Sequence, residues 1–232
     1  MTSNVRRARS GTALEDTTPP DRRRNGPVTK TKLERAAALL FDTRGFRTTT
    51  MKDIAEECGL TPAAFYNHYP SKQDILFSIV VNSYDRLISS VNEAMKVAGN
   101  SPIDRLHAAI SAMSKWLLEN PYEARVSRRE LQELDKTTRA QLTDRWRKFR
   151  RTLEDVILDG IANGQFRTPG RRPSDMPKVF ATAIVSMVEA LPEAYPESRS
   201  GARGTTDEKA TELLIWLVDR LLSVESPNGV GN

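Results

Sequence analysis

The stretch from Thr48 to Leu76 constrains the fold most, because it carries three separate helix-start signals within 29 residues. The first signal pairs Thr50 with Asp53. This spacing places a hydroxyl at a helix N-cap and a carboxylate near the positive end of the helix dipole. Gly59 follows shortly afterwards and favours the left-handed conformation that ends a helix. The stretch therefore begins with a short helix and a sharp turn.

A second helix is predicted directly after this turn. Thr61 suits its N-cap and Pro62 suits its first helical position. Pro70 limits its length, because the residue before a proline disfavours the helical conformation. Ser71 and Asp74 then begin a third helix. Two short helices joined by a tight turn form a helix-turn-helix, whose second helix normally enters the DNA major groove.

This stretch resembles the DNA-binding signature of TetR-family transcriptional regulators. The match covers about 50 residues, from Thr29 to Ile79. The residues that carry it are Ile54, Ala55, Gly59, Leu60, Thr61, residues 63–69, Ser71 and Lys72. The chain departs from the family pattern at Ala63, Phe65 and Tyr69, where Gly, Leu and Phe are usual. A helix tolerates these three changes.

The resemblance implies which side chains contact DNA. The family's phosphate-contacting positions are occupied here by Tyr66, His68 and Lys72, and Thr50 is a further candidate at a helix N-terminus. The positions nearest the base edges are occupied by Thr61, Pro62, Ala63 and Asn67. Among these, Asn is the side chain that reads adenine bidentately. Tyr69 joins the set, because the polar tips from Tyr66 to Tyr69 exceed what a short buried helix satisfies internally. An ordinary surface or packing position is the alternative for His68.

Composition bounds the class of protein. With 232 residues, 38% of them hydrophobic, and a mean hydropathy of −0.51, the chain can bury a core and is predicted to be soluble. No apolar run approaches the roughly 18 residues that span a bilayer, and the Arg-bearing N-terminus lacks the apolar segment of a secretory signal. Cys58 is the single cysteine, which excludes an intrachain disulfide and fits a reducing cytoplasm. We interpret Cys58 as a small buried helix residue rather than a redox sensor.

The positive charge is concentrated around the helix-turn-helix. Residues 1–77 hold 13 Lys and Arg against 9 Asp and Glu, whereas residues 78–232 hold 22 against 21. This excess suits phosphate binding. The sequence has no Gly-rich phosphate loop, nucleophile elbow or metal-ligand cluster, and it has only two histidines. We therefore predict neither an enzyme nor a bound metal or cofactor.

We expect an all-α fold with two domains. The predicted segments are a disordered basic tail over 1–27, a three-helix DNA-binding domain over 28–73, a helical ligand-binding and dimerisation domain over 74–225, and a frayed C-terminus over 226–232. In the tail, Arg22 to Arg24 either reach a minor groove or stay solvated. The first helix is predicted over 28–43, before Gly45.

The second domain is predicted from helical periodicity. A helix from Lys72 to about Val97 is long enough to link the two domains. Further helices are expected over 101–120, 122–134, 136–163, 174–191 and 206–224, with loops over 165–174 and 192–204. The last helix has a wider apolar arc than packing on one surface requires. In the family, the last two long helices pair with those of a second subunit.

The C-terminal helices of the family enclose a small-molecule pocket. Our inward-facing candidates are His107, Met113, Trp116, Tyr122, Phe149, Phe180 and Met187. Core packing is the alternative role for each of them. Arg125, Arg128 and Arg129 cluster near the expected pocket mouth. They either take an anionic group, such as a carboxylate or the phosphates of a CoA thioester, or form a solvated basic face.

The resemblance implies a cytoplasmic homodimer that binds a palindromic double-stranded DNA operator, with its reading helices roughly 34–36 Å apart. A small effector, hydrophobic or acyl in type, would shift the dimer to another spacing and release the DNA. An effector that favours the DNA-bound spacing would make the protein a corepressed regulator. One alternative is a DNA binder of the same fold controlled by a protein partner or by no ligand. Another is a helical adaptor, which would lack the polar tips and Lys72 that this chain has.

Overall fold

The computed structural model describes residues 30–167, 176–194 and 205–222, and the regular secondary structure within these ranges is entirely helical. The predicted tail over 1–27 and the predicted frayed end over 226–232 lie outside the described residues. Among the described helices, none combines the length and the apolar character needed to cross a membrane. The all-α fold predicted from the sequence is confirmed.

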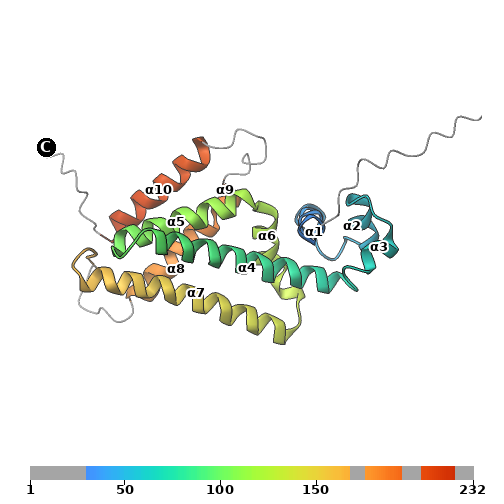
Figure 1. Cartoon of the computed structure of the whole chain (residues 1–232), viewed down its shortest axis with the longest axis horizontal. Coiled ribbons are helices and arrows are strands. Elements are labelled where there is room, and N and C mark those ends of the chain that lie inside the picture. The colour runs from blue at the N-terminus through green and yellow to red at the C-terminus, as the bar shows by residue number, and fades with distance from the viewer. Residues whose placement is uncertain (1–29, 168–175, 195–204, 223–232) are drawn as a thin grey trace, which may run out of the picture.

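Three helices form a compact unit at one end of the molecule (Figure 1): α1 (Lys30–Arg44), α2 (Met51–Glu57) and α3 (Pro62–Tyr66). The predicted caps are present. The Thr50 hydroxyl accepts the Asp53 amide at 3.1 Å, and the Thr61 hydroxyl accepts the Ala64 amide at 3.2 Å. Gly59 has a φ of +68° between α2 and α3, a conformation that a residue with a Cβ rarely adopts. These local signals set the sharp turn of the helix-turn-helix.

Helix α4 (Lys72–Val97) runs from this unit along the length of the second domain (Figure 1). Its first half packs into the core of the DNA-binding unit through Ile75, Leu76, Ile79 and Val80. Its second half packs into a separate core through Leu87, Val91 and Met95. One continuous helix therefore belongs to two hydrophobic cores, as its predicted length implied.

The remaining helices build the second domain around α4. They are α5 (Pro102–Glu119), α6 (Pro121–Arg129), the 3-10 turn η2 (Glu130–Glu133), α7 (Lys136–Ala162), α8 (Met176–Glu189), α9 (Leu191–Ala194) and α10 (Thr205–Leu221). Their core is aliphatic and aromatic, and each fully buried Leu, Ile or Phe contributes about 1.5–3 kcal/mol. Figure 1 shows α6 lying between this bundle and α1.

The predicted exposed loop over 192–204 is wrong at its first residues. Helix α9 occupies Leu191–Ala194, and Leu191 and Pro192 are buried. A single helical turn is too short to produce a periodic signal, and its burial depends on contacts with α5 and α6. The rest of that loop, from residue 195, lies outside the described residues.

Candidate nucleic-acid interface and ligand cavity

Helix α3 is anchored by one buried side chain and presents polar side chains to solvent. Phe65 is fully buried in the core formed with α1, α2 and α4. On the other side, Tyr66 is 50% exposed, and Asn67 and His68 are also exposed. The remaining predicted base-reading residues Thr61, Pro62 and Ala63 are exposed at the start of the helix. Six of the predicted DNA-contacting side chains thus lie on the surface of α3 and of the residues that flank it, and Phe65 anchors this segment in the core.

Thr50 is exposed, but its hydroxyl is already engaged. It donates to the Asp53 carboxylate at 2.7 Å while accepting the Asp53 amide, and the Thr50 amide donates to the same carboxylate. The hydrogen bonds from Thr50 lower the pKa of Asp53. Because this reciprocal cap consumes the donors of Thr50, a phosphate there would have to replace the Asp53 carboxylate.

Tyr69 departs from the prediction. Its side chain is only 4% exposed, and its hydroxyl donates to the Glu34 carboxylate of α1 at 2.8 Å. Ser78 and Asn82 of α4 each donate to the same carboxylate oxygen at 2.7 Å. Burial raises the pKa of Tyr69 to about 12. Tyr69 is therefore a core residue, because its polar tip is satisfied by a residue 35 positions earlier in the chain.

Lys72 also occupies a different environment from the one expected of a phosphate ligand. Its Nζ donates to the carbonyl oxygens of Phe46, Arg47 and Thr49 at 2.7, 3.2 and 2.9 Å. An ammonium group has three N–H donors, so all of them are used. The Lys72 ammonium therefore binds the backbone carbonyls of the segment between α1 and α2 and has no N–H left for a phosphate.

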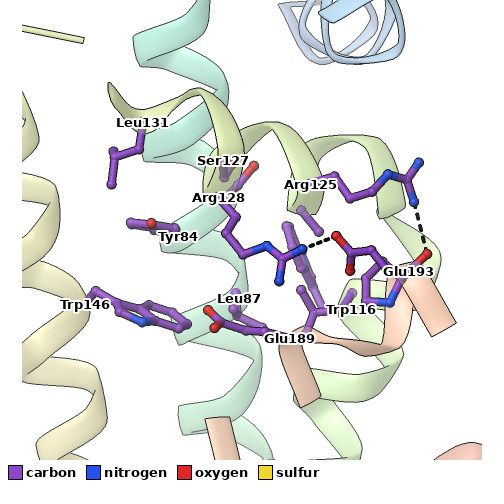
Figure 2. A pocket seen from close by; sticks show the side chains of 14 residues that line it. Tyr84, Leu87, Trp116, Arg125, Ser127, Arg128, Leu131, Trp146, Glu189 and Glu193 are labelled. Carbon is purple, nitrogen blue, oxygen red and sulfur yellow. Dashed lines mark hydrogen bonds and ion pairs between the residues drawn. The ribbon is translucent and has the colours of Figure 1, made fainter. Parts of the chain in front are cut away.

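A cavity of about 230 Å³ lies between α4, α5, α6, α7 and the α8–α9 segment. Figure 2 shows aromatic rings from three helices around it, with charged groups on one side. The lining residues are Ser83, Tyr84, Leu87, Trp116, Leu117, Ala124, Arg125, Ser127, Arg128, Leu131, Trp146, Glu189, Pro192 and Glu193. Tyr84 and Trp146 stack with ring centroids 5.2 Å apart. A small, largely apolar molecule fits such a site.

Three of the predicted ligand residues line the cavity, namely Trp116, Arg125 and Arg128. The other six candidates do not line it. Met113, Phe149 and Phe180 are buried in the bundle core, Met187 packs against that core, and Tyr122 packs against the core of the DNA-binding unit. His107 hydrogen-bonds through Nε2 to Asp219 of α10 at 2.7 Å. Core packing was the alternative role for each candidate. The structure shows this role for all of these residues except His107.

Sequence reasoning missed several lining residues that have chemical character, among them Tyr84 and Glu189. Burial raises the pKa of Tyr84 to about 12 and raises the pKa of the Glu189 carboxyl. Neither residue belongs to a recognisable motif. Glu189 is a polar side chain within an otherwise apolar helical stretch, whereas Tyr84 lies among polar neighbours and has no such signal.

The cavity arginines are already paired with carboxylates. Arg125 holds Asp42 of α1 through Nε and Nη2, and Arg128 pairs with Glu193 of α9 (Figure 2 shows the second pair). Arg129, predicted beside them, also pairs with Asp42. The solvated basic face considered from sequence is therefore wrong for Arg125, which is buried at 8% exposure.

Cys58 lies in the DNA-binding unit and not at the cavity, and it is half-buried against the core of that unit. Burial raises the pKa of the Cys58 thiol, with the nearby Glu57 charge acting in the same direction, which disfavours the reactive thiolate. Within the described residues there is no group of three or more His, Cys, Asp or Glu placed to hold a metal ion.

Comparison with known proteins gives concordant results for both halves of the chain. Residues 34–79 match the model of bacterial regulatory proteins of the tetR family, and residues 99–198 match a tetracyclin repressor-like C-terminal domain. The transcriptional repressor KstR2 of Mycobacterium tuberculosis is 28% identical over 132 residues, which are 56% of this chain and 66% of that repressor. The match thus spans slightly less than two thirds of the relative's length.

Solved structures share the fold. The ketosteroid transcriptional regulator KstR2 of Mycobacterium tuberculosis superposes with a TM-score of 0.72 at 22% identity, over 85% of this chain and 95% of that one. AibR, solved with isovaleryl coenzyme A and operator DNA, gives a TM-score of 0.69 at 24% identity, over 84% and 99%. The matched family consists of transcriptional regulators and not of enzymes. This chain belongs to the TetR family of transcriptional regulators.

Proposed function

We propose that this chain is a sequence-specific transcriptional repressor that binds a palindromic operator as a homodimer in the cytoplasm. A small hydrophobic or acyl-type effector releases it. The observation that carries the proposal is the exposed polar surface of α3, held in place by the buried Phe65. An exposed helix of a helix-turn-helix is placed to enter the major groove, where Asn67 can read a base edge.

The dimer is supported by an apolar surface on α8 and α10. The exposed apolar residues there are Val179, Leu213, Trp216, Leu217 and Leu221. Four of them follow one another along α10, and both helices are long enough to pair with a second copy. Apolar residues exposed in such a row mark a protein interface rather than a solvated face. A symmetric dimer would place two α3 helices on successive turns of DNA.

The effector is supported by the cavity and by the related proteins. The cavity has room for a small ligand among Tyr84, Trp116 and Trp146, next to α6. AibR was solved with isovaleryl coenzyme A, and KstR2 is named a ketosteroid regulator. The acyl group of isovaleryl coenzyme A is a compact apolar part. The cavity volume of about 230 Å³ suits such a part and not a whole coenzyme A.

Binding to the DNA upstream of the protein's own gene tests this function. The protein is titrated against that DNA and against a scrambled duplex over a series of salt concentrations, with and without isovaleryl coenzyme A and free hydrophobic acids. We expect selective binding that one class of compound weakens by about 5- to 150-fold. Equal affinity for both duplexes at every salt concentration would contradict sequence-specific repression and favour the adaptor alternative.

A further inference from the structure

Helix α6 contacts the cavity and the DNA-binding unit at the same time. Ala124, Arg125, Ser127 and Arg128 of this helix line the cavity. The same helix packs extensively against α1, and Val126 joins the core of the DNA-binding unit. A single helix of nine residues thus lies between the cavity and the first helix of the DNA-binding unit.

The strongest link across this contact is the ion pair between Arg125 and Asp42. The Nε of Arg125 lies 3.0 and 3.1 Å from the two Asp42 carboxylate oxygens, and Nη2 lies 2.6 Å from Oδ2. Both side chains are less than 10% exposed. A bidentate arginine–carboxylate pair at this burial resists separation, because moving either partner leaves an uncompensated charge away from water.

Two further contacts surround this ion pair. One connects Arg125 to the cavity wall, and the other gives Asp42 a second arginine partner. Its Nη1 donates to the Pro192 carbonyl of α9 at 3.2 Å, and Pro192 itself lines the cavity. Arg129, one helical turn further along α6, holds the same Asp42 carboxylate. Asp42 therefore stays paired when Arg125 shifts, so the cost of a shift is lower than for an isolated buried pair.

We propose that Arg125 is the residue that couples occupancy of the cavity to the DNA-binding domain, by pulling on Asp42 of α1 when α6 or α9 moves. This inference rests on the proposed function and assigns a positioning residue to it. An occupant that displaces α6 changes the position of the guanidinium, and the paired carboxylate carries this change into α1. Arg125 thus acts on α1 and is not an anchor for an anionic ligand, because its bidentate face is already taken by Asp42.

The rest of the DNA-binding unit follows α1 because it shares its core. Leu33, Ala37 and Phe41 of α1 are buried against Ile54 of α2 and Phe65 of α3. A close-packed core transmits a shift of one helix to its neighbours instead of absorbing it. A second tether exists between Arg47 and Glu133 of η2 at 3.0 Å, but Arg47 is 82% exposed. A solvent-exposed pair contributes little, and Arg129, which shares Asp42, is itself 47% exposed, so Arg125 with Asp42 is the most buried of these three pairs.

The test fills the cavity by mutation and needs neither an identified effector nor an operator. Ser127→Leu adds volume at the cavity wall and loses no hydrogen bond, since Ser127 Oγ is buried without a partner among the described residues. Ala124→Trp is a second, larger filling variant. Each is placed in the unaltered chain and in a chain that also carries Arg125→Gln, which leaves the Arg129–Asp42 pair in place. Circular dichroism first confirms that each chain is folded, and amide hydrogen exchange is then measured in α1 to α3.

We expect filling to change the amide exchange rates of α1 by about fivefold or more in the unaltered chain, the lower end of typical coupling between sites. The same filling should change them by less than about twofold when the Asp42–Arg125 pair is absent. The matched control removes another ion pair, Asp85 with Arg145 between α4 and α7, by Asp85→Asn with Arg145→Gln. The response of α1 should persist in this control.

An equal response of α1 with and without the Asp42–Arg125 pair would overturn the coupling role of Arg125. So would no response in the unaltered chain to either filling variant. These results are separate from a failure of the proposed function, which would appear as equal binding to operator and scrambled DNA in the unaltered protein. Coupling seen in exchange together with unselective DNA binding would reject the repressor and retain the role of Arg125.

Discussion

The Nζ of Lys72 lies 2.7 Å from the carbonyl oxygen of Phe46 and 4.5 Å from the centre of its ring. The ammonium therefore joins the start of α4 to the segment between α1 and α2 through a charge-assisted hydrogen bond and a cation–π contact. This segment precedes the helix-turn-helix. A lysine that the family resemblance assigns to DNA phosphate thus has an internal role in holding the DNA-binding unit on α4.

Replacing Lys72 by Met is expected to lower the free energy of unfolding by about 1–3 kcal/mol, because three carbonyls lose their shared donor. The salt dependence of DNA binding should not change. Loss of a phosphate contact would reduce the slope of log K against log salt by about 0.9. Chemical denaturation and DNA titrations measure the two effects. Lys96→Met, on the exposed end of α4, is the control and should alter neither. A stable Lys72→Met protein with a reduced slope would restore the phosphate role.

Asn67→Ala is expected to relax the preference for one base position in each half-site by about 1–3 kcal/mol, because a bidentate base contact is lost. Affinity for sites that already differ at that position should stay the same. Binding to a set of operators with single base changes measures this. Tyr66→Phe is the comparison, since loss of a phosphate contact weakens binding to all these sites equally. An unchanged base preference would remove Asn67 from the base-reading residues.

Tyr69, which is buried, and Tyr84, which is half-buried, predict loss of stability at alkaline pH. Burial is the first cause that raises the pKa of both Tyr69 and Tyr84 from 10.0 to about 12. In the unfolded chain both ionise near pH 10.0, while the folded chain keeps them neutral. The stability that they contribute is therefore complete below pH 10.0 and is lost as the pH rises to about 12. Ultraviolet titration of phenolate should show two late steps.

Tyr69→Phe and Tyr84→Phe should each remove one of these late steps. Tyr69→Phe should also cost about 1–3 kcal/mol at neutral pH, because its hydroxyl donates to the buried Glu34 carboxylate. A Tyr69→Phe protein as stable as the unaltered chain would show that Ser78 and Asn82 satisfy Glu34 without it.

Gly160→Ala in α7 is expected to destabilise the protein by about 1–3 kcal/mol, against the gain of about 1 kcal/mol that helix propensity alone predicts. A Cβ at this position would overlap the ring of Phe166, which is buried against the helix. Thermal or chemical unfolding measures the change. Adding Phe166→Leu should recover part of the loss, and a stabilised Gly160→Ala protein would contradict this packing.

Trp216→Glu is expected to weaken homodimerisation by about 2 kcal/mol or more, or roughly 30-fold in Kd, since it places a charge in the apolar row of α10. Sedimentation velocity across a range of concentrations measures the effect. Leu158→Glu on α7 is the matched control, because Leu158 is 47% exposed and Trp216 is 53% exposed. Equal behaviour of the two variants would argue against an interface at α10.

The helix-turn-helix was predictable because its signals are local. The cap of Thr50 with Asp53, the cap of Thr61 and the left-handed Gly59 each depend on residues only a few positions apart. The cavity was predictable only in part. Trp116, Arg125 and Arg128 were expected near it, whereas Met113 and Phe149 have the same helical spacing and lie in the core. Periodicity shows that a side chain faces inward, but not whether the space there is filled.

The sequence alone determined the all-α fold, the position of the helix-turn-helix and the family, because caps, turns and helical periodicity act over short stretches of chain. The tertiary structure alone decided the roles of Tyr69, Lys72 and Arg125. Their partners Glu34, Phe46 and Asp42 lie 35, 26 and 83 positions away. Such polar groups take whichever partner the packed helices bring within hydrogen-bond distance, and only the folded core fixes which one that is.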